Sequence, residues 1–321
     1  MKIKVGIVGY GNLGKALEEM LLKDKRFKLV AIFSRRVVVS KFNTPIEPYD
    51  EFLTYKKKIN IMFLCGSSAS DIQIQAPEIS KYFNIINSFD IHSRLTKLTK
   101  ELDLINKQYK TVSLSAVGWD PGLLSIIRCL CFGISDEIPS TFWGKGVSMG
   151  HSDAVRKIDG VIDAVQFTVP NKDAMIFSKK MKSCENIAKH NRECYVVSNL
   201  GEENRKIIAE KIKNIPNYFK GQPTHVEFVS QIELIRLEKN MSHKGTVINP
   251  FYLSKNKKAY LEFVAKMDSN PHFTAKIMLR FAFGVMNFVL SQNFGAFLPI
   301  DIPISSLFSE KELIFIKNNL C

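Results

Sequence analysis

The sequence predicts an α/β protein in two parts, a doubly wound parallel sheet followed by an α+β domain. Short apolar runs alternate with helical patterns over the first 118 residues, as expected for parallel strands joined by crossover helices. Beyond Gly118 the β-type stretches are longer, and several alternate apolar with polar residues, which favours a mixed or antiparallel sheet with one solvated face. A length of 321 residues accommodates both parts.

The first part is expected to form strands wherever a short apolar run is followed by a turn or a helical pattern. The run at residues 59–64 illustrates this, because it is apolar almost throughout, as a strand buried on both faces should be. The expected strands are 3–8, 27–33, 59–64, 84–88 and 111–114, and the expected helices are 13–22, 73–82 and 95–106.

The second part is expected to combine longer strands with helices. The expected strands are 164–169, 193–198, 225–233 and 259–267, and the expected helices are 201–213, 273–291 and 308–319. The last helix is expected to return to the first part. We therefore expect one domain at 1–118, completed by about 293–321, and a substrate-binding and dimerisation domain at 119–292.

The formal net charge of +14 is spread along the chain, and no helix-turn-helix, zinc-finger or RNP-type motif accompanies it. This favours a lysine-rich surface that attracts small anions over a nucleic-acid partner. No apolar run reaches the roughly 20 residues needed to cross a bilayer. The N-terminus starts with a strand and lacks the features of a signal peptide. We expect a cytoplasmic protein with no membrane partner.

The cysteines and histidines do not form a metal-binding pattern. The six cysteines, at 65, 129, 131, 184, 194 and 321, include no C-x-x-C pair. Cys129 and Cys131 point to different sides if they lie on a helix, as we expect. The six histidines show no H-E-x-x-H spacing. We expect reduced, mostly structural cysteines and no metal site.

A glycine fingerprint directly follows the first expected strand and opens the first expected helix. Gly9, Gly11 and Gly14 have the G-x-G-x-x-G spacing, which allows a tight turn, close approach of a pyrophosphate and close helix packing. The N–H groups at the helix start then face the phosphates. This indicates a Rossmann-type dinucleotide domain, and the predicted cofactor-binding segment is Gly9, Tyr10, Gly11, Asn12, Leu13 and Gly14.

The end of the second expected strand indicates which dinucleotide binds. No acid occurs between Phe27 and Ser40 to accept the ribose 2′-hydroxyl of NAD, and Ser34, Arg35 and Arg36 stand there instead. A guanidinium binds a 2′-phosphate through paired, charge-assisted hydrogen bonds. We therefore predict NADP as the cofactor. The alternative is a solvated basic turn.

Three further loops leave the carboxyl ends of the expected parallel strands, where ligands bind in open sheets. The first, Cys65, Gly66, Ser67 and Ser68, is predicted to contact the cofactor. The other two contain Asp90 and Asp120, with Trp119 beside the latter. Two carboxylates here suit a substrate ammonium group, which one of them could deprotonate. The alternatives are a turn aspartate for Asp90 and a helix N-cap before Pro121 for Asp120.

Seven segments together resemble the meso-diaminopimelate dehydrogenase family. They follow one another in the family's order across most of the chain, and Gly-Trp-Asp-Pro-Gly and Gly-His-Ser-Asp are far more specific than a glycine fingerprint. The segments are 8–14, 33–36, 118–122, 141–144, 150–153, 241–245 and 268–271.

The resemblance implies an activity and an assembly. Members of this family oxidise the D-centre of meso-2,6-diaminopimelate with NADP, which yields L-2-amino-6-oxopimelate and ammonia. The reverse reaction is a reductive amination in lysine and peptidoglycan precursor synthesis. Members form homodimers in which the second domain binds substrate and dimerises.

The resemblance also implies residue roles. Asp90 and Asp120 would hold and deprotonate the reacting amine, and Trp119 and Trp143 would wall the reacting centre. The far end of the substrate would be held by Thr168, Arg192, His243 and Asn270, with Asp153 helping to close that pocket. Taken alone, an arginine such as Arg192 is more often a surface charge, His243 more often a loop histidine, and a tryptophan usually a packing residue.

One position in the expected far-end pocket departs from the family pattern. Met149 stands where relatives often have Gln, which removes an amide from the expected far-end pocket. This leaves open a second hypothesis, an NADP-dependent dehydrogenase of another D-amino or diamino acid. A third is a non-catalytic NADPH-binding regulator, against which the retained far-end residues argue.

Overall fold

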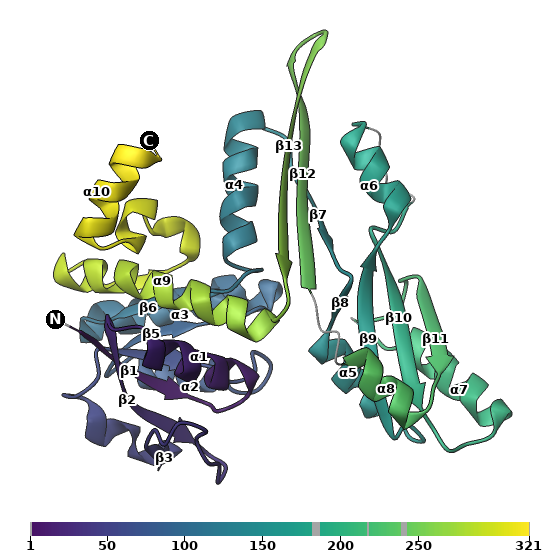
Figure 1. The fold of residues 1–321 in the computed structure, drawn as a ribbon, viewed down its shortest axis with the longest axis horizontal. Coiled ribbons are helices and arrows are strands. Elements are labelled where there is room, and N and C mark those ends of the chain that lie inside the picture. The colour runs from purple at the N-terminus through teal and green to yellow at the C-terminus, as the bar shows by residue number, and fades with distance from the viewer. Residues whose placement is uncertain (1, 182–186, 217, 239–242, 321) are drawn as a thin grey trace. The chain divides into compact units, whose positions relative to one another are not determined.

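The computed structural model describes residues 2–181, 187–216, 218–238 and 243–320 (Figure 1). It consists of two compact units, each described here by itself. The first comprises Met1–Ile126 and Pro271–Cys321, and the second comprises Ile127–Asn270. The division at residues 118 and 292 remains a prediction about which residues bind nucleotide and which bind substrate.

The first unit contains a seven-stranded sheet in which all neighbouring strands are parallel. The strand order is β14-β6-β5-β4-β1-β2-β3, so the order reverses between β1 and β4. The strands are β1 (Ile3–Val8), β2 (Phe27–Ser34), β3 (Ile46–Pro48), β4 (Ile61–Leu64), β5 (Asn84–Asn87), β6 (Val112–Leu114) and β14 (Gly295–Phe297).

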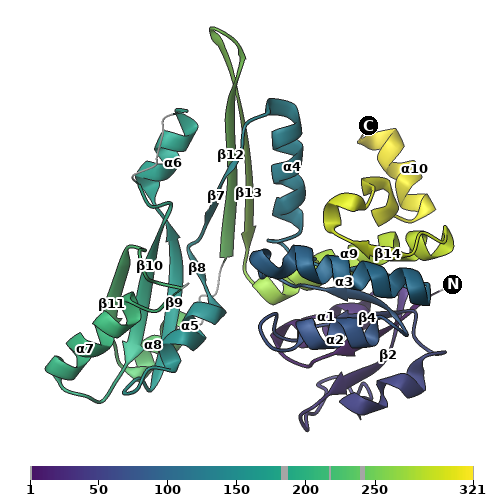
Figure 2. The same ribbon diagram turned by 180° about the vertical axis from the view of Figure 1, so that it is seen from behind.

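Helices cover both faces of this sheet, and a separate apolar cluster lies under each set (Figures 1 and 2). On one face α1 (Asn12–Lys23) and α9 (Asn270–Leu290) pack on Val5, Ile7 and Phe63. On the other, α2 (Ile72–Ile79) and α3 (His92–Tyr109) pack on alternate residues of the same strands, such as Met62 and Leu64. The predicted doubly wound α/β fold is confirmed.

The C-terminal segment completes the first unit. Strand β14 pairs in parallel with β6, and the 3-10 turns η2 (Pro299–Asp301) and η3 (Ile304–Leu307) lead to α10 (Glu310–Asn319). Glu312 links α10 to the rest of the first unit, because it accepts hydrogen bonds from Arg26 and Arg280, each at 2.9 Å. Burial raises the pKa of Glu312, but the Ser309 N–H and hydroxyl and the Arg280 guanidinium outweigh it and lower the pKa to about 2.

Helix α9 is long and apolar enough to meet the length and composition criteria of a membrane span. Its side chains Ala275, Met278, Ala282 and Val285 are, however, fully buried in the core of the first unit. The core helix of a folded domain satisfies the same criteria, and α9 packs as one.

The second unit contains two smaller sheets (Figure 2). One has the order β11-β10-β9-β8 and is mixed, since β10 and β11 are parallel whereas its other pairs are antiparallel. The other, β13-β12-β7, is antiparallel. The strands are β7 (Ser140–Trp143), β8 (Gly146–Val147), β9 (Asp163–Pro170), β10 (His190–Val197), β11 (Thr224–Phe228), β12 (His243–Ser254) and β13 (Lys257–Met267).

Helices pack on both faces of the mixed sheet. Two of them, α5 (Met149–Arg156) and α7 (Glu202–Lys213), cover one face through Val155, Ile208 and Ile212. Leu234 of α8 (Gln231–Glu238) packs on the opposite face. Near the antiparallel sheet lies α6 (Lys172–Lys179), and α4 (Leu123–Ser135) begins in the first unit and ends in the second.

One expected strand is wrong in part. Residues 225–233 were expected to be extended throughout, but β11 ends at Phe228 and α8 begins at Gln231. Ser230 ends the strand because its Oγ accepts a hydrogen bond from the Glu233 N–H at 3.2 Å, which caps the new helix. Strands β3, β7, β8, β12 and β14 and helices α5 and α6 were not anticipated.

Candidate cofactor and substrate site

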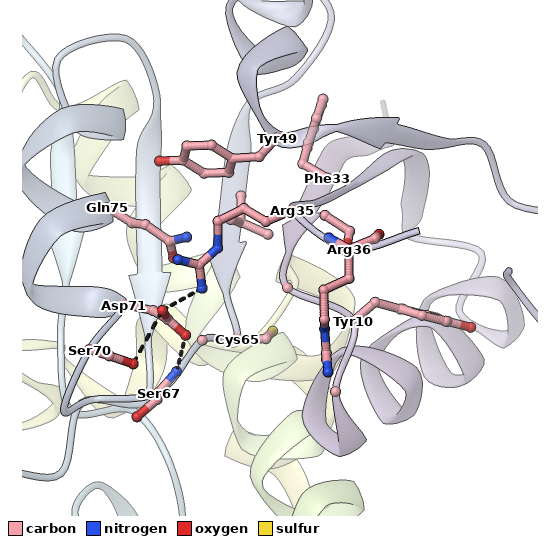
Figure 3. A pocket seen from close by; sticks show the side chains of 15 residues that line it. Tyr10, Phe33, Arg35, Arg36, Tyr49, Cys65, Ser67, Ser70, Asp71 and Gln75 are labelled. Atoms are coloured by element: carbon pink, nitrogen blue, oxygen red, sulfur yellow. Dashed lines mark hydrogen bonds and ion pairs between the residues drawn. The ribbon is translucent and has the colours of Figure 1, made fainter. Parts of the chain in front are cut away.

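A cavity of about 650 Å³ opens at the carboxyl ends of β1, β2 and β4, where the strand order reverses (Figure 3). Crevices at such a reversal are the usual ligand sites of open parallel sheets. It is lined by Val8, Gly9, Tyr10, Gly11, Phe33, Ser34, Arg35, Arg36, Tyr49, Cys65, Gly66, Ser67, Ser70, Asp71 and Gln75. The structure thus brings together most of the predicted cofactor residues.

The segment that joins β1 to α1 and includes the start of that helix, residues 9–14, is called the glycine loop here, and it has the geometry that a dinucleotide phosphate needs. Gly9 has a φ of 94°, in the left-handed region that favours glycine. A Cβ on Gly14 would lie 2.2 Å from the Gly9 carbonyl oxygen, so only glycine allows α1 to start this close to the turn. A Cβ on Gly11 would meet nothing within 4 Å, so its backbone stays accessible. The loop therefore fits a pyrophosphate.

The segment after β2 presents two arginines from a fixed backbone. Ser34 Oγ accepts the Arg36 N–H at 3.1 Å and donates to the Arg36 carbonyl at 2.9 Å. Figure 3 shows the Arg35 side chain extending toward Asp71 and the Arg36 side chain toward Tyr10. Both arginines line the cavity, which fits the predicted recognition of a 2′-phosphate.

Asp71 is a cavity residue that the sequence interpretation missed. Its Oδ1 lies 2.5 Å from Arg35 Nη2, and its Oδ2 accepts the Ser67 N–H at 2.9 Å. Burial raises the pKa of the Asp71 carboxyl, but the Ser67 N–H and the Arg35 guanidinium outweigh it, so the pKa lies below its usual range. Tyr49, Ser70 and Gln75 were missed as well, since no local motif marks them.

A fully buried carboxylate joins the glycine loop to the segment after β2. Glu18 on α1 accepts hydrogen bonds from the Tyr10 hydroxyl and, at 2.5 Å, from Ser40 Oγ. Ser40 Oγ in turn accepts the N–H groups of Phe42 and Thr44 at 2.9 and 3.1 Å. Burial and Glu18 raise the pKa of Tyr10. Both walls of the cavity are therefore tied to the first turns of α1.

The loops after β4, β5 and β6 are also hydrogen-bonded to one another. The Asp90 N–H donates to Ser68 Oγ at 3.1 Å, and the Val117 N–H donates to the Asn87 carbonyl at 2.9 Å. Asp90 is exposed, whereas Trp119 is buried, with only 9% of its surface exposed. These loops lie at the carboxyl end of the sheet, as predicted.

Asp120 lies in a tight turn rather than directly before a helix. Trp119 and Gly122 form an isolated bridge, and α4 begins only at Leu123. The Leu124 N–H donates to the Trp119 carbonyl, so this turn leads into the helix. The expected alternative, an N-cap immediately before a helix starting at Pro121, is therefore wrong in its position.

In the second unit, three predicted residues lie on neighbouring strands. Thr168 on β9 is directly opposite both Arg192 on β10 and Gly146 on β8. Arg192 Nη1 donates to Thr168 Oγ1 at 3.0 Å. A Cβ on Gly146 would lie 3.0 Å from the His243 ring, whose Nε2 is 2.9 Å from the Val147 carbonyl oxygen. Thr168, Arg192 and His243 thus form one cluster.

Trp143 is oriented by a histidine that the sequence interpretation did not identify. The Trp143 N–H donates to His190 Nε2 at 2.8 Å, and the two rings stack with centroids 5.0 Å apart. Because that nitrogen accepts a hydrogen bond, His190 is neutral here. Burial, with Arg192 nearby, lowers the pKa of His190 to about 4.

Arg192 is a buried cation with unused hydrogen-bonding capacity. Its Nε is buried without a partner, and among the described residues no carboxylate forms an ion pair with its guanidinium. Burial lowers the pKa of Arg192. His151, whose Nδ1 is 2.6 Å from Ser148 Oγ, has its pKa lowered to about 4 by burial and by Arg192. Such a cation suits a ligand carboxylate.

The remaining predicted residues lie on helices α5 and α9. Met149 begins α5 and is 49% exposed, and Asn270 begins α9. Asp153 pairs with Arg156 at 2.8 Å, and Arg156 also binds Asp163, so Asp153 has a structural partner. Among the cysteines, Cys65, Cys129, Cys131 and Cys194 are free thiols, whereas 184 and 321 lie outside the described residues.

Comparison with known proteins gives matches along the whole chain. The family model described as the diaminopimelic acid dehydrogenase C-terminal domain matches residues 118–269. The meso-diaminopimelate D-dehydrogenase of Ureibacillus thermosphaericus is 39% identical over 317 residues, which cover 95% of each chain. The chain belongs to the meso-diaminopimelate D-dehydrogenase family. This confirms the resemblance inferred from the seven sequence segments.

Solved structures of this family share the fold. The diaminopimelate (DAP) dehydrogenase of Corynebacterium glutamicum, in complex with DAP, matches with a TM-score of 0.91 and 31% identity over 99% of each chain. An engineered D-amino acid dehydrogenase bound to NADP⁺ matches with a TM-score of 0.87 and 30% identity, over 98% of this chain and 99% of the other. These matches span both units of the diaminopimelate dehydrogenase fold.

Proposed function

We propose that this chain catalyses the NADP-dependent oxidative deamination of the D-centre of meso-2,6-diaminopimelate. The substrate, NADP⁺ and water give L-2-amino-6-oxopimelate, ammonia, NADPH and a proton. The reverse reductive amination would serve lysine and peptidoglycan precursor synthesis. The observation that carries this proposal is the family match, 39% identity over 95% of the chain.

The cavity of the first unit supports NADP as the cofactor. The glycine loop would bind the pyrophosphate through backbone N–H groups, and Ser34, Arg35 and Arg36 would bind the 2′-phosphate. When bound, NADP supplies the acceptor for the hydrogen and two electrons removed from the α-carbon. Cys65, Gly66 and Ser67 line the same crevice, and the loop at 65–68 would contact the nicotinamide half.

The proposed substrate-binding residues come from both units. Asp90 and Asp120 would bind the reacting ammonium group and take up its proton, beside Trp119. In the second unit Arg192 would bind the far carboxylate, since its guanidinium is buried without a carboxylate partner among the described residues. The other proposed substrate residues are Trp143, Met149, Asp153, Thr168, His243 and Asn270.

The direct test follows NADPH absorbance after the protein is mixed with NADP⁺ and meso-diaminopimelate. NADPH formation with the meso compound, but not with the LL isomer or with NAD⁺, is expected. Asp120→Asn should lower turnover strongly and leave NADPH affinity unchanged, since Asp120 would act on the amine. Equal losses of turnover and NADPH affinity would instead give Asp120 a structural role.

A second candidate function is the dehydrogenation of another D-amino or diamino acid. The exposed Met149 favours it, because a thioether at the start of α5 offers no amide to a second amino-acid centre. A panel of D-amino acids measured against meso-diaminopimelate separates the two candidates. Met149→Gln should then increase the preference for the meso compound.

We also propose a cytoplasmic homodimer. Exposed apolar side chains on α4 and on the β12–β13 hairpin support an interface with a second copy. They are Leu130, Phe132, Ile134, Tyr252, Leu253, Tyr260 and Val264. Burial of such a set of side chains against another subunit is the usual explanation of their exposure in a single chain.

A further inference from the structure

Asp71 occupies the N-cap position of α2 but does not cap the helix. An N-cap aspartate ordinarily accepts a backbone N–H from the first turn of its own helix. Asp71 has φ −102° and ψ −56°, and its side chain makes no such bond. Its oxygens are used elsewhere: Oδ1 lies 2.5 Å from Arg35 Nη2, and Oδ2 accepts the Ser67 N–H at 2.9 Å (Figure 3). The carboxylate is therefore directed into the cofactor cavity.

The loop before α2 is built closely around this carboxylate. A Cβ on Gly66 would lie 2.6 Å from Asp71 Cβ and 2.9 Å from its Oδ2, so any other residue would displace the side chain. The Ser70 hydroxyl lies 3.3 Å from Oδ1. Only 15% of the Asp71 side chain is exposed, compared with 61% of the Arg35 side chain. The aspartate is the fixed partner, and the arginine is the one that it orders.

The neighbouring arginine differs in this respect. Across the described ranges, no carboxylate lies within ion-pairing distance of Arg36, whose backbone alone is fixed by Ser34. Arg35 donates to Asp71 through Nη2 alone, whereas a guanidinium has five N–H donors. The remaining donors of Arg35 stay available to a phosphate while the side chain is held in one orientation.

We propose that Asp71 is a positioning residue that fixes Arg35 for the 2′-phosphate, and that it thereby contributes to the preference for NADP over NAD. This rests on the proposed use of NADP. An exposed arginine loses side-chain freedom when it binds a ligand, and a partner that orders it beforehand removes that cost from the binding step. The carboxylate also repels the phosphate, but together Arg35, Arg36 and Asp71 retain a net positive charge.

A double-mutant cycle tests this through cofactor binding without catalysis. NADPH and NADH affinities are measured by fluorescence titration for the wild type, Asp71→Asn, Arg35→Met and the double variant. Asp71→Asn should weaken NADPH binding about fivefold, the scale of an exposed ion pair, and change NADH binding less than about twofold. In the Arg35→Met background, Asp71→Asn should change NADPH affinity less than about twofold.

Three results would overturn the inference. Equal NADPH losses in both backgrounds would mean that Asp71 acts through the loop rather than through Arg35. Unchanged or tighter NADPH binding by Asp71→Asn would mean that the carboxylate weakens phosphate binding. Equal losses for NADPH and NADH would remove any role in selectivity. A wild type that does not bind NADPH contradicts the proposed function instead.

If Asp71→Asn does not fold, a second variant tests the same inference. Gly66→Ala keeps every charge but displaces the Asp71 carboxylate, and it should reproduce the selective loss of NADPH affinity. Gly133→Ala is its matched control, since a Cβ there meets nothing within 4 Å. Wild-type NADPH affinity in Gly66→Ala would also overturn the inference.

Discussion

Single residues in the cofactor cavity show how little space surrounds the glycine loop. Gly14 is the tightest case, because its Cβ would lie 2.2 Å from the Gly9 carbonyl oxygen, which belongs to backbone and cannot rotate away. Gly14→Ala should therefore destabilise the protein by about 1–3 kcal/mol and abolish NADPH binding. Thermal unfolding and NADPH titration measure the two effects.

The control for Gly14 is again Gly133 on α4. Gly133→Ala should leave NADPH affinity unchanged and increase stability slightly, since alanine is favoured over glycine by about 0.5–1 kcal/mol inside a helix. A Gly14→Ala protein with the wild-type melting temperature would show that the loop is looser than its geometry indicates.

Arg192 leads to opposite expectations for stability and for function. A buried cation with an unpartnered Nε is costly in the absence of a ligand. Arg192→Met should therefore increase the free energy of unfolding by about 1 kcal/mol, while it raises the KM for meso-diaminopimelate strongly and leaves NADPH affinity unchanged. A destabilised variant with an unchanged KM would make Arg192 a structural residue. Thermal unfolding and steady-state kinetics are the measurements.

The residues of the cavity differ in how far the sequence could predict them. Gly9, Gly11 and Gly14 were predicted because their function depends on spacing within one short segment. Asp71 and Tyr49 reach the same cavity from segments far along the chain. Asp71 could have been noticed as a polar residue before an expected helix, but that position ordinarily indicates a cap, and only the fold shows Arg35 opposite it.

At the scale of elements, two buried histidines give the second unit a pH dependence. His151 and His190 each have a pKa of about 4 in the folded protein, against about 6.5 when unfolded. The unfolded chain therefore binds more protons between these values. The stabilisation is complete above about pH 6.5 and is lost as the pH falls toward 4. At pH 5 each histidine should reduce stability by up to about 2 kcal/mol.

Chemical denaturation at pH 7.5 and pH 5 checks this loss. The comparison stops above the range in which carboxylates with lowered pKa, such as Glu312, begin to titrate. His190→Gln should reduce the pH dependence, whereas His225→Gln should not, since His225 is exposed on β11. Equal stability at both pH values would contradict the assignment of neutral, buried rings.

The elements that the sequence missed have identifiable causes. Strand β12 contains Pro250, which argues against a central strand. The structure tolerates it because β7 pairs only with residues up to Ile248, so one side of β12 is open at Pro250. At α8 the signal was present, since Ser230 and Glu233 have capping-box spacing. The apolar alternation before them obscured it.

At the scale of the whole molecule, the proposed homodimer makes a direct prediction. Sedimentation at micromolar concentration should give twice the mass of the 36.5 kDa chain. Leu130→Glu and Leu253→Lys, placed on α4 and on the β12–β13 hairpin, should shift the mass toward the monomer without unfolding the chain. A monomeric wild type would contradict the proposal.

The second unit is inserted between α4 and α9, and the sheet of the first unit is completed by β14 near the C-terminus. During synthesis, β1 to β6 therefore leave the ribosome long before α9 and β14 do. Until then one face of the nascent sheet is covered by α1 but lacks α9, and β6 has a free edge. Because such edges pair with other chains, the interval in which residues 127–270 are translated is the period of greatest exposure to aggregation and to chaperones.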